Sequence, residues 1–395
     1  MKIGIWAGVC LGVALLMAGC KGFWDLPATT TTTTPTTLSS GVFYVLNQAT
    51  SQIAAYFISS GTLETVSGSP YALTIAPSSI AVAPGGGFLY VGTLNGVYIY
   101  TIGSGGVPTI ANSGATIFDD IPSAIVVSGS WVVDAFVNIG GQVQLNAYPI
   151  SSSTGLSTLC STCQVPSQSF TIASAAVKQM VLSPDGDNLL LALGSGGTIV
   201  VPFAAGNSNP LGSTATAIGV LNSGGSALSV AVDPSNRVFY IGETLANSSA
   251  NSGGLRVFNY SSLGTGTLTQ ATGSPIASGE TAPNAILPLA SGEYVYVANG
   301  AGNTAAGNIA WFPITASGTT YTIASGSTIA AGIVPIGLAE DNEHNFVLAV
   351  ATGGSTSSGD PDLEAYTMSS GALTSALTAK TGTDPVGAIA IAALP

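Results

Sequence analysis

Residues 77–92 read PSSIAVAPGGGFLYVG, and this stretch contains the pattern that decides the fold. A Pro opens a short apolar run, a Gly-rich turn follows, and a second apolar run with an aromatic centre ends the stretch. Short runs of apolar and aromatic residues on either side of a tight turn predict an antiparallel pair of strands. A further run, Val97–Tyr100, adds a third strand. The stretch therefore predicts one small antiparallel sheet.

The same unit recurs along the chain from Gly41 onward. The centres of its second strand recur every 43 to 57 residues, at Tyr44, Tyr90, Val133, Leu190, Tyr240, Tyr296 and Leu348. A Pro precedes the first strand in most copies, at Pro77, Pro122, Pro283, Pro335 and Pro385. Repeats of about 40–50 residues with four strands each are typical of a β-propeller. Seven copies predict an all-β, seven-bladed β-propeller.

The two ends of the repeat region complement one another. The first copy begins with a second strand at residues 42–45, whereas the last copy, residues 385–391, supplies a first strand and stops. Pairing the C-terminal first strand with the N-terminal strands completes the seventh blade and leaves no bare sheet edge. We therefore expect the C-terminal strand to be the innermost strand of a blade that closes the ring.

The first 40 residues differ from the repeats. Residues 3–18 form one apolar run after a single Lys, which fits a secretory signal better than a membrane-spanning helix. The run ends in LMAGC at residues 16–20, which resembles the bacterial lipobox, where the Cys is lipidated and becomes the new N-terminus. The resemblance implies a signal peptide at residues 1–19, a lipid anchor on Cys20 and, because Lys21 follows, the outer membrane. An ordinary cleaved signal with a chance Cys is the alternative.

Residues 20–40 include six consecutive Thr and show no hydrophobic periodicity, so they cannot contribute to a core. They predict a tether between the anchor and a propeller domain at residues 41–395. The expected location is the cell envelope, on either side of the outer membrane, and the expected state is a monomer.

Composition limits the possible partners. Charged residues make up 6% of the chain and hydrophobic residues 46%, which excludes a disordered chain. Six basic residues stand against 18 acidic ones, for a net charge of −12, and the basic residues are scattered singly. Nucleic acids and anionic lipid head groups need clustered Lys and Arg, so neither is expected as a partner. A protein or a glycan fits this surface better.

Several segments resemble the YVTN-repeat, lactonase-like seven-bladed propellers, a group related to 6-phosphogluconolactonase. The resemblance rests on the strands at residues 89–93 and 296–299 and on the turns at 183–186 and 232–236, and it covers about residues 41–395. Enzymes of this group place His and Arg around the central channel, just before each first strand. The corresponding positions here are Ser78, Ser123, Lys178, Leu228, Asn284, Ile336 and Val386. None is His or Arg, which weakens the expectation of lactone hydrolysis.

Other polar side chains remain near the predicted channel. They lie at the ends of second strands or just before first strands, and they are Asn47, Asp134, Lys178, Glu243, Asn284 and Asn299. Such a set predicts a polar, weakly acidic pocket for a sugar, a small molecule or a cation. Ordinary capping of strand ends is the alternative for each residue. No cofactor and no metal site is predicted, since the acidic run at residues 360–364 matches no calcium loop.

Cysteine and histidine offer little chemistry. Cys160 and Cys163 are predicted to form a local disulfide, because such a pair oxidises readily outside the cytoplasm. His344 is the single histidine, and it lies in a predicted turn between a first and a second strand. We interpret it as a solvated hairpin tip, since a catalytic His needs a carboxylate or nucleophile arranged around it.

Two functions follow from these observations. The first is a lipid-anchored, non-catalytic module that binds a protein or a glycan, with long second-to-third strand loops in the late blades as its working face. The alternative is a lactonase-like hydrolase or isomerase with an atypical channel site. The missing channel His and Arg favour the first, so whether the chain is an enzyme stays open.

Overall fold

The computed structural model describes residues 41–159, 163–246, 252–264, 267–301, 305–317, 320–324, 326–352, 361–379 and 387–395. The chain divides into two compact units, Met1–Thr37 and Leu38–Pro395, and the description concerns the second. The predicted signal peptide, Cys20 and the tether up to residue 40 lie outside the described residues. Within the described ranges, no helix is long and apolar enough to cross a membrane.

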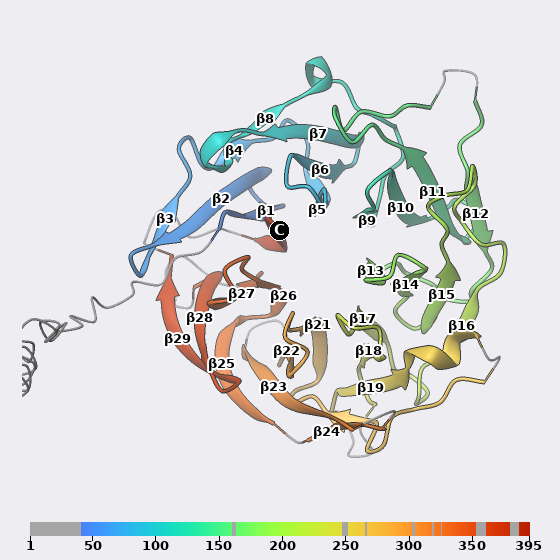
Figure 1. Ribbon diagram of the computed structural model, residues 1–395, viewed down its shortest axis with the longest axis vertical. Helices are drawn as coiled ribbons and strands as arrows, with labels where there is room; N and C mark the ends of the chain where they lie inside the picture. Colours follow the sequence, from blue (N-terminus) through green and yellow to red (C-terminus); the bar gives the residue numbers. More distant parts are fainter. Residues whose placement is uncertain are drawn as a thin grey trace, which may run out of the picture. The chain divides into compact units, whose positions relative to one another are not determined.

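The described residues form seven antiparallel sheets, or blades, that follow one another around a common centre (Figure 1). Blades 1 to 3 contain β5 (Pro77–Val82), β6 (Phe88–Thr93), β7 (Gly96–Ile102) and β8 (Pro108–Ile110); β9 (Ala124–Val127), β10 (Trp131–Val137), β11 (Val143–Pro149) and β12 (Ser167–Phe170); and β13 (Gln179–Leu182), β14 (Asn188–Ala192), β15 (Thr198–Pro202) and β16 (Thr216–Ile218).

Blades 4 to 6 contain β17 (Ala227–Val232), β18 (Val238–Glu243), β19 (Gly254–Asn259) and β20 (Ile276–Ala277); β21 (Ala282–Pro288), β22 (Tyr294–Gly300), β23 (Ala306–Ser317), β24 (Thr320–Ile323) and β25 (Ser327–Ile333); and β26 (Pro335–Glu340), β27 (Phe346–Ala351), β28 (Leu363–Ser369) and β29 (Ala372–Thr378). Short 3-10 turns occur at η1 (Ser104–Gly106), η2 (Asn112–Gly114) and η3 (Tyr260–Gly264). The first strand of each blade lies nearest the centre in Figure 1, and the fourth lies at the rim.

Blade 7 combines the two ends of the propeller, as the sequence predicts. Its strands are β30 (Ala388–Ala393), β1 (Phe43–Asn47), β2 (Gln52–Ser59) and β3 (Thr62–Thr65), with β4 (Tyr71–Ala72) paired to β2. The C-terminal β30 pairs antiparallel with β1, and Tyr44 lies opposite Ala392. The prediction of a seven-bladed ring closed by an innermost C-terminal strand is therefore confirmed.

The core lies between neighbouring blades. The seven predicted centres of the second strands (Tyr44, Tyr90, Val133, Leu190, Tyr240, Tyr296 and Leu348) are all buried, with at most 1% of each exposed. Removing one such side chain from water contributes about 1.5–3 kcal/mol. Both faces of each blade are covered by its neighbours, which explains apolar strands that do not alternate with polar residues.

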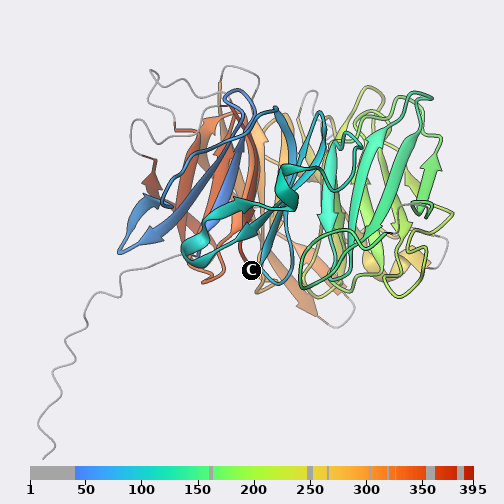
Figure 2. The same cartoon turned by 90° about the horizontal axis from the view of Figure 1, so that it is seen from above.

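The strands run between two faces of the propeller, which Figure 2 shows from the side. We call the first the turn face, because it bears the tight turns between first and second strands; it also bears the connections between third and fourth strands. The opposite loop face bears the connections between second and third strands. Parts of the three long loops predicted as a working face (residues 247–251, 302–304 and 353–360) lie outside the described residues, so that hypothesis stays a prediction.

Candidate functional site

The first strands begin with a bulge at several of the predicted channel positions. The register of β5, β21 and β26 shifts around residues 78, 284 and 336, and β17 shifts around residue 228. Ser78 Oγ donates a hydrogen bond to the carbonyl oxygen of Pro122 at 2.7 Å. Asn284 Nδ2 donates to the carbonyl oxygen of Pro335 at 2.9 Å. Ser78 therefore binds the residue two places before the first strand of the next blade, and Asn284 binds the first residue of that strand in its own next blade.

Three predicted site residues near the ends of second strands are buried. Glu243 pairs with Arg256 at 2.6 Å between Oε1 and Nη1, and its Oε2 accepts the backbone N–H of Leu221 at 3.0 Å. Asn299 Nδ2 donates to the carbonyl oxygen of Ser278 at 2.6 Å. Asn47 is 2% exposed at the end of β1. Glu243 and Asn299 are therefore buried side chains whose contacts join their strands to neighbouring segments of the chain.

Asp134 lies in the middle of β10 and is fully buried. Its Oδ1 accepts the backbone N–H of Asn146 at 3.2 Å, while its buried Oδ2 has no hydrogen-bond partner among the described residues. Burial raises the pKa of Asp134 well above its usual value, and the negative charge of Asp120 raises it further. Asp120 accepts hydrogen bonds from Tyr148 and from Asn146 Nδ2. Burial and the neighbouring charge therefore both favour the protonated form of Asp134.

The six predicted residues come from five of the seven blades. Asn284 and Asn299 lie on paired strands of blade 5. The other four, Asn47, Asp134, Lys178 and Glu243, come from four different blades, and of these only Lys178 is exposed. No hydrogen bond or ion pair joins two of the six within the described residues, and their role in binding stays a prediction. Cys163 is disulfide-bonded, and its predicted partner Cys160 lies outside the described residues.

A cavity of about 630 Å³ opens on the turn face between blades 5 and 6. Its wall is formed by the turn between β21 and β22, the turn between β26 and β27, and the turn between β28 and β29. The lining residues that can bind or react are Ser291, Glu293, Tyr294, Glu340, His344, Met368 and Ser370. A volume of this size is typical of small-molecule sites.

His344 and Glu340 form a fixed pair in this cavity. His344 Nδ1 lies 2.7 Å from Glu340 Oε1. Glu340 Oε2 accepts the backbone N–H of Ala290 at 2.7 Å, so the turn of blade 5 holds a carboxylate that belongs to blade 6. The Glu340 side chain is 12% exposed and that of His344 62% exposed. A carboxylate on Nδ1 fixes that nitrogen as the donor and leaves the Nε2 lone pair free for a proton.

The turn that carries His344 is built around Asp341. Its carboxylate accepts the backbone N–H groups of Glu343, Asn345 and Phe346 at 3.3, 2.8 and 2.6 Å. His344 itself has a φ of +57°, which costs energy for most residues with a Cβ. The same turn position in other blades holds Gly86, Gly186, Asn236 and Gly292, all with positive φ. An imidazole therefore occupies a position that the other turns give to Gly or Asn.

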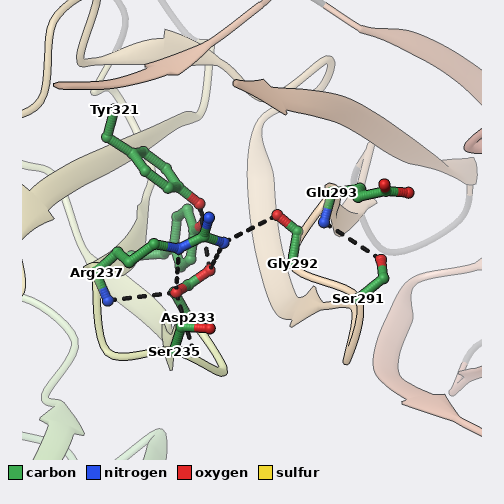
Figure 3. A network of polar contacts seen from close by, with 8 residues as sticks. Asp233, Ser235, Arg237, Ser291, Gly292, Glu293 and Tyr321 are labelled. Carbon is green, nitrogen blue, oxygen red and sulfur yellow. Dashed lines mark hydrogen bonds and ion pairs between the residues drawn. The ribbon is translucent and has the colours of Figure 1, made fainter. Parts of the chain in front are cut away.

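An arginine network adjoins the cavity (Figure 3). Arg237 Nε and Nη2 bind the two carboxylate oxygens of Asp233 at 2.8 and 2.6 Å, and Nη2 also donates to the carbonyl oxygen of Gly292 at 3.0 Å. The guanidinium carbon lies 5.1 Å from the centre of the Tyr321 ring. The network joins the turn of blade 4 to the turn of blade 5, beside Ser291 and Glu293.

Neither the cavity nor the pairing of Glu340 with His344 is predicted by the sequence patterns described above. The four-residue spacing between them was the available signal, because a tight turn brings such residues together. Among the described residues, no group of three or more His, Cys, Asp or Glu side chains is arranged to hold a metal ion.

No protein-family model matches the chain, and no curated protein sequence is similar to it. Solved structures do resemble it. One is a candidate 6-phosphogluconolactonase from Bacteroides fragilis, with a TM-score of 0.66 and 16% identity over 90% of this chain and 98% of that one. Another is a periplasmic gluconolactonase from Pseudomonas aeruginosa, with a TM-score of 0.64 and 18% identity over 91% of this chain and 100% of that one.

A third is a candidate 6-phosphogluconolactonase from Bacteroides uniformis, with a TM-score of 0.65 and 16% identity over 89% of this chain and 99% of that one. These neighbours are 6-phosphogluconolactonase-like seven-bladed propellers. At this level of identity the likeness shows a shared fold over the whole propeller. It leaves the reaction to be argued from the side chains.

Proposed function

We propose that the protein hydrolyses a sugar lactone in the cavity between blades 5 and 6. The observation that carries the proposal is the His344–Glu340 pair, fixed by the Ala290 N–H and open to a cavity of about 630 Å³. Support also comes from the gluconolactonase-type structures that match the whole propeller. Of the two functions predicted from the sequence, the lactonase-like hydrolase fits better than the non-catalytic module. The proposed site is this cavity and not the central channel.

The chemistry requires one base and one bound water. His344 Nε2 takes a proton from water as the oxygen attacks the lactone carbonyl carbon, and Glu340 stabilises the imidazolium that forms. The tetrahedral intermediate then collapses, the bond from the carbonyl carbon to the ring oxygen breaks, and the ring oxygen takes the proton back from Nε2. The product is the open-chain hydroxy acid. A positioned base of this kind contributes about 10²–10⁴-fold to the rate.

The remaining cavity wall suits a sugar ring. Tyr294 and Met368 offer apolar surface, while Ser291, Ser370 and Glu293 offer groups that exchange hydrogen bonds with hydroxyls. Small-molecule sites commonly combine an apolar wall with a few polar groups that fix orientation.

The test is hydrolysis of δ-gluconolactone above its spontaneous rate, followed by pH-stat. We expect wild-type turnover, a loss of about 100-fold in kcat for His344→Asn, and about 10-fold or more for Glu340→Gln. Asn is chosen because it tolerates positive φ at this turn position. Glu343→Gln is the matched control, since that side chain is exposed on the same turn and does not line the cavity. No turnover, or full turnover in His344→Asn, would contradict the proposal.

A non-catalytic binding module for a glycan or a protein is the second candidate. One observation favours it: the described channel positions carry no His or Arg. In addition, the side chains of Ser78 and Asn284 already donate hydrogen bonds to carbonyl oxygens of the neighbouring blade. Sugar binding by wild type without turnover of any lactone would support this candidate. Loss of turnover in Asp134→Asn or Glu243→Gln, with His344→Asn active, would instead move a reaction to the channel.

A further inference from the structure

The cavity between blades 5 and 6 carries two Glu side chains and no Lys or Arg among the described residues that line it. Glu293 is exposed at its edge and Glu340 lies in its wall. The single imidazole, His344, is already bound to Glu340. Phosphate recognition in proteins relies on Arg, Lys or clustered backbone N–H groups. This wall would instead place carboxylates beside the doubly negative phosphate group.

The nearest guanidinium described beside the cavity is committed elsewhere. Arg237 forms a two-point contact with Asp233, whose side chain is fully buried, and it also binds the carbonyl oxygen of Gly292 (Figure 3). Turning Arg237 toward a phosphate would leave the buried carboxylate of Asp233 without its only cationic partner among the described residues. Breaking such a pair from one side is strongly unfavourable, so Arg237 is held where it is.

We infer that this cavity takes an uncharged polyhydroxy ligand and rejects the phosphorylated form of the same sugar. The inference rests on the proposed lactone site and names its substrate class. The Glu293 carboxylate accepts hydrogen bonds from ligand hydroxyls, and a carboxylate repels a phosphate group. Discrimination therefore comes from a repulsive element as well as from fit.

Two readouts test the inference. The first is kcat/KM for δ-gluconolactone against 6-phosphogluconolactone, where we expect the neutral lactone to be preferred by about 100-fold. The second does not depend on turnover, and it compares binding of D-glucose and glucose 6-phosphate by saturation-transfer NMR. We expect signal for glucose only. Preference for the phosphorylated member in either readout, equal use of both lactones, or no binding of either sugar overturns the inference.

Charge variants locate the effect. Glu293→Lys should shift the ratio of kcat/KM, or of binding, toward the phosphorylated sugar by about 10-fold or more. Glu343→Lys makes the same change in net charge at an exposed position outside the cavity wall, and it should leave the ratio unchanged. Equal shifts in both variants would show that net charge alone decides, which contradicts the inference. Glucose preference without lactone turnover would refute the proposed reaction and keep this inference.

Discussion

The hydroxyl of Tyr90 lies 2.7 Å from the carbonyl oxygen of Gly155, 65 residues further along the chain. Tyr90 is the centre of a second strand in blade 1, and Gly155 lies in the turn after the third strand of blade 2. Tyr44 with Gly106 and Tyr296 with Gly371 repeat this relationship, at 2.8 and 3.0 Å. Each of the three glycines has a positive φ. A buried tyrosine thus fastens the turn of the following blade.

Changing either partner should lower stability for a different reason. Tyr90→Phe leaves a buried carbonyl without its donor, which costs about 1–3 kcal/mol. At Gly155 an added Cβ would lie 2.4 Å from Ile99 Cδ1, and φ is +67°, so Gly155→Ala should cost about 2–4 kcal/mol. Gly186→Ala is the matched control, because φ is +77° there but nothing lies within 4 Å. Urea unfolding should show a larger loss in the free energy of unfolding for Gly155→Ala than for Gly186→Ala. Equal losses would argue against the packing contact.

Deleting residues 385–395 should destabilise the whole propeller. The deletion removes β30, which leaves β1 as a bare edge in a ring that closes only through this pair. We expect a thermal midpoint at least about 10 °C lower, or failure to fold, measured by circular dichroism. Removal of Pro395 alone, which lies beyond β30, serves as the control. A truncated protein that melts like the full chain would refute closure as a source of stability.

Asp134 should make stability depend on pH. Its pKa is raised in the folded protein, first by burial and then by Asp120, so above pH ~4 the folded state binds a proton that the unfolded state has released. Stability contributed by this group is therefore complete below pH ~4 and declines as pH rises through the folded pKa. Asp134→Asn removes the ionisation.

The expected result is a difference in thermal midpoint between Asp134→Asn and wild type that is smallest near pH 3.5 and grows in favour of the variant toward pH 8. Asp119→Asn is the control, because that carboxylate is exposed beside the same segment. A difference that stays constant over this pH range would show that Asp134 titrates normally.

Cys20→Ala should release the protein from membranes. The prediction follows from the lipobox-like residues 16–20, and it is checked by fractionating cells that express the full-length chain. Cys10→Ala, within the apolar run, should leave the membrane fraction unchanged. If Cys20→Ala stays with the membrane, the N-terminus is not a lipid anchor.

The fold could be predicted because its determinants are local and repeated. Each second-strand centre, such as Tyr90 or Leu348, stands in a short apolar run beside a tight turn, and seven copies make the pattern unambiguous. The complementary ends at residues 42–45 and 385–391 then fix the closure. The repeated unit and the complementary ends can both be recognised from the sequence, because strands and tight turns depend mainly on residues that are close together along the chain.

The sites could be predicted only in part, because they depend on contacts between blades. The sequence predicts that Asn299 and Glu243, near the ends of their strands, lie at the channel mouth. In the structure Asn299 binds the carbonyl oxygen of Ser278, and Glu243 pairs with Arg256. The His344 pair requires the left-handed turn conformation and the Ala290 N–H, which comes from a turn 50 residues earlier. Nothing local in the sequence specifies which turn of blade 5 faces that of blade 6.

The tyrosine–glycine contacts also limit how far the seven units are interchangeable. Blades 7, 1 and 5 carry the tyrosine that fastens a glycine turn in the next blade, whereas the corresponding centres of blades 2, 3 and 6 are Val133, Leu190 and Leu348, which have no hydroxyl. Blades 7, 1 and 5 are therefore each matched to the blade that follows. An engineer who shuffles or adds units to this propeller would have to move each of these three blades together with the blade that follows it, because the contact between the two depends on their order.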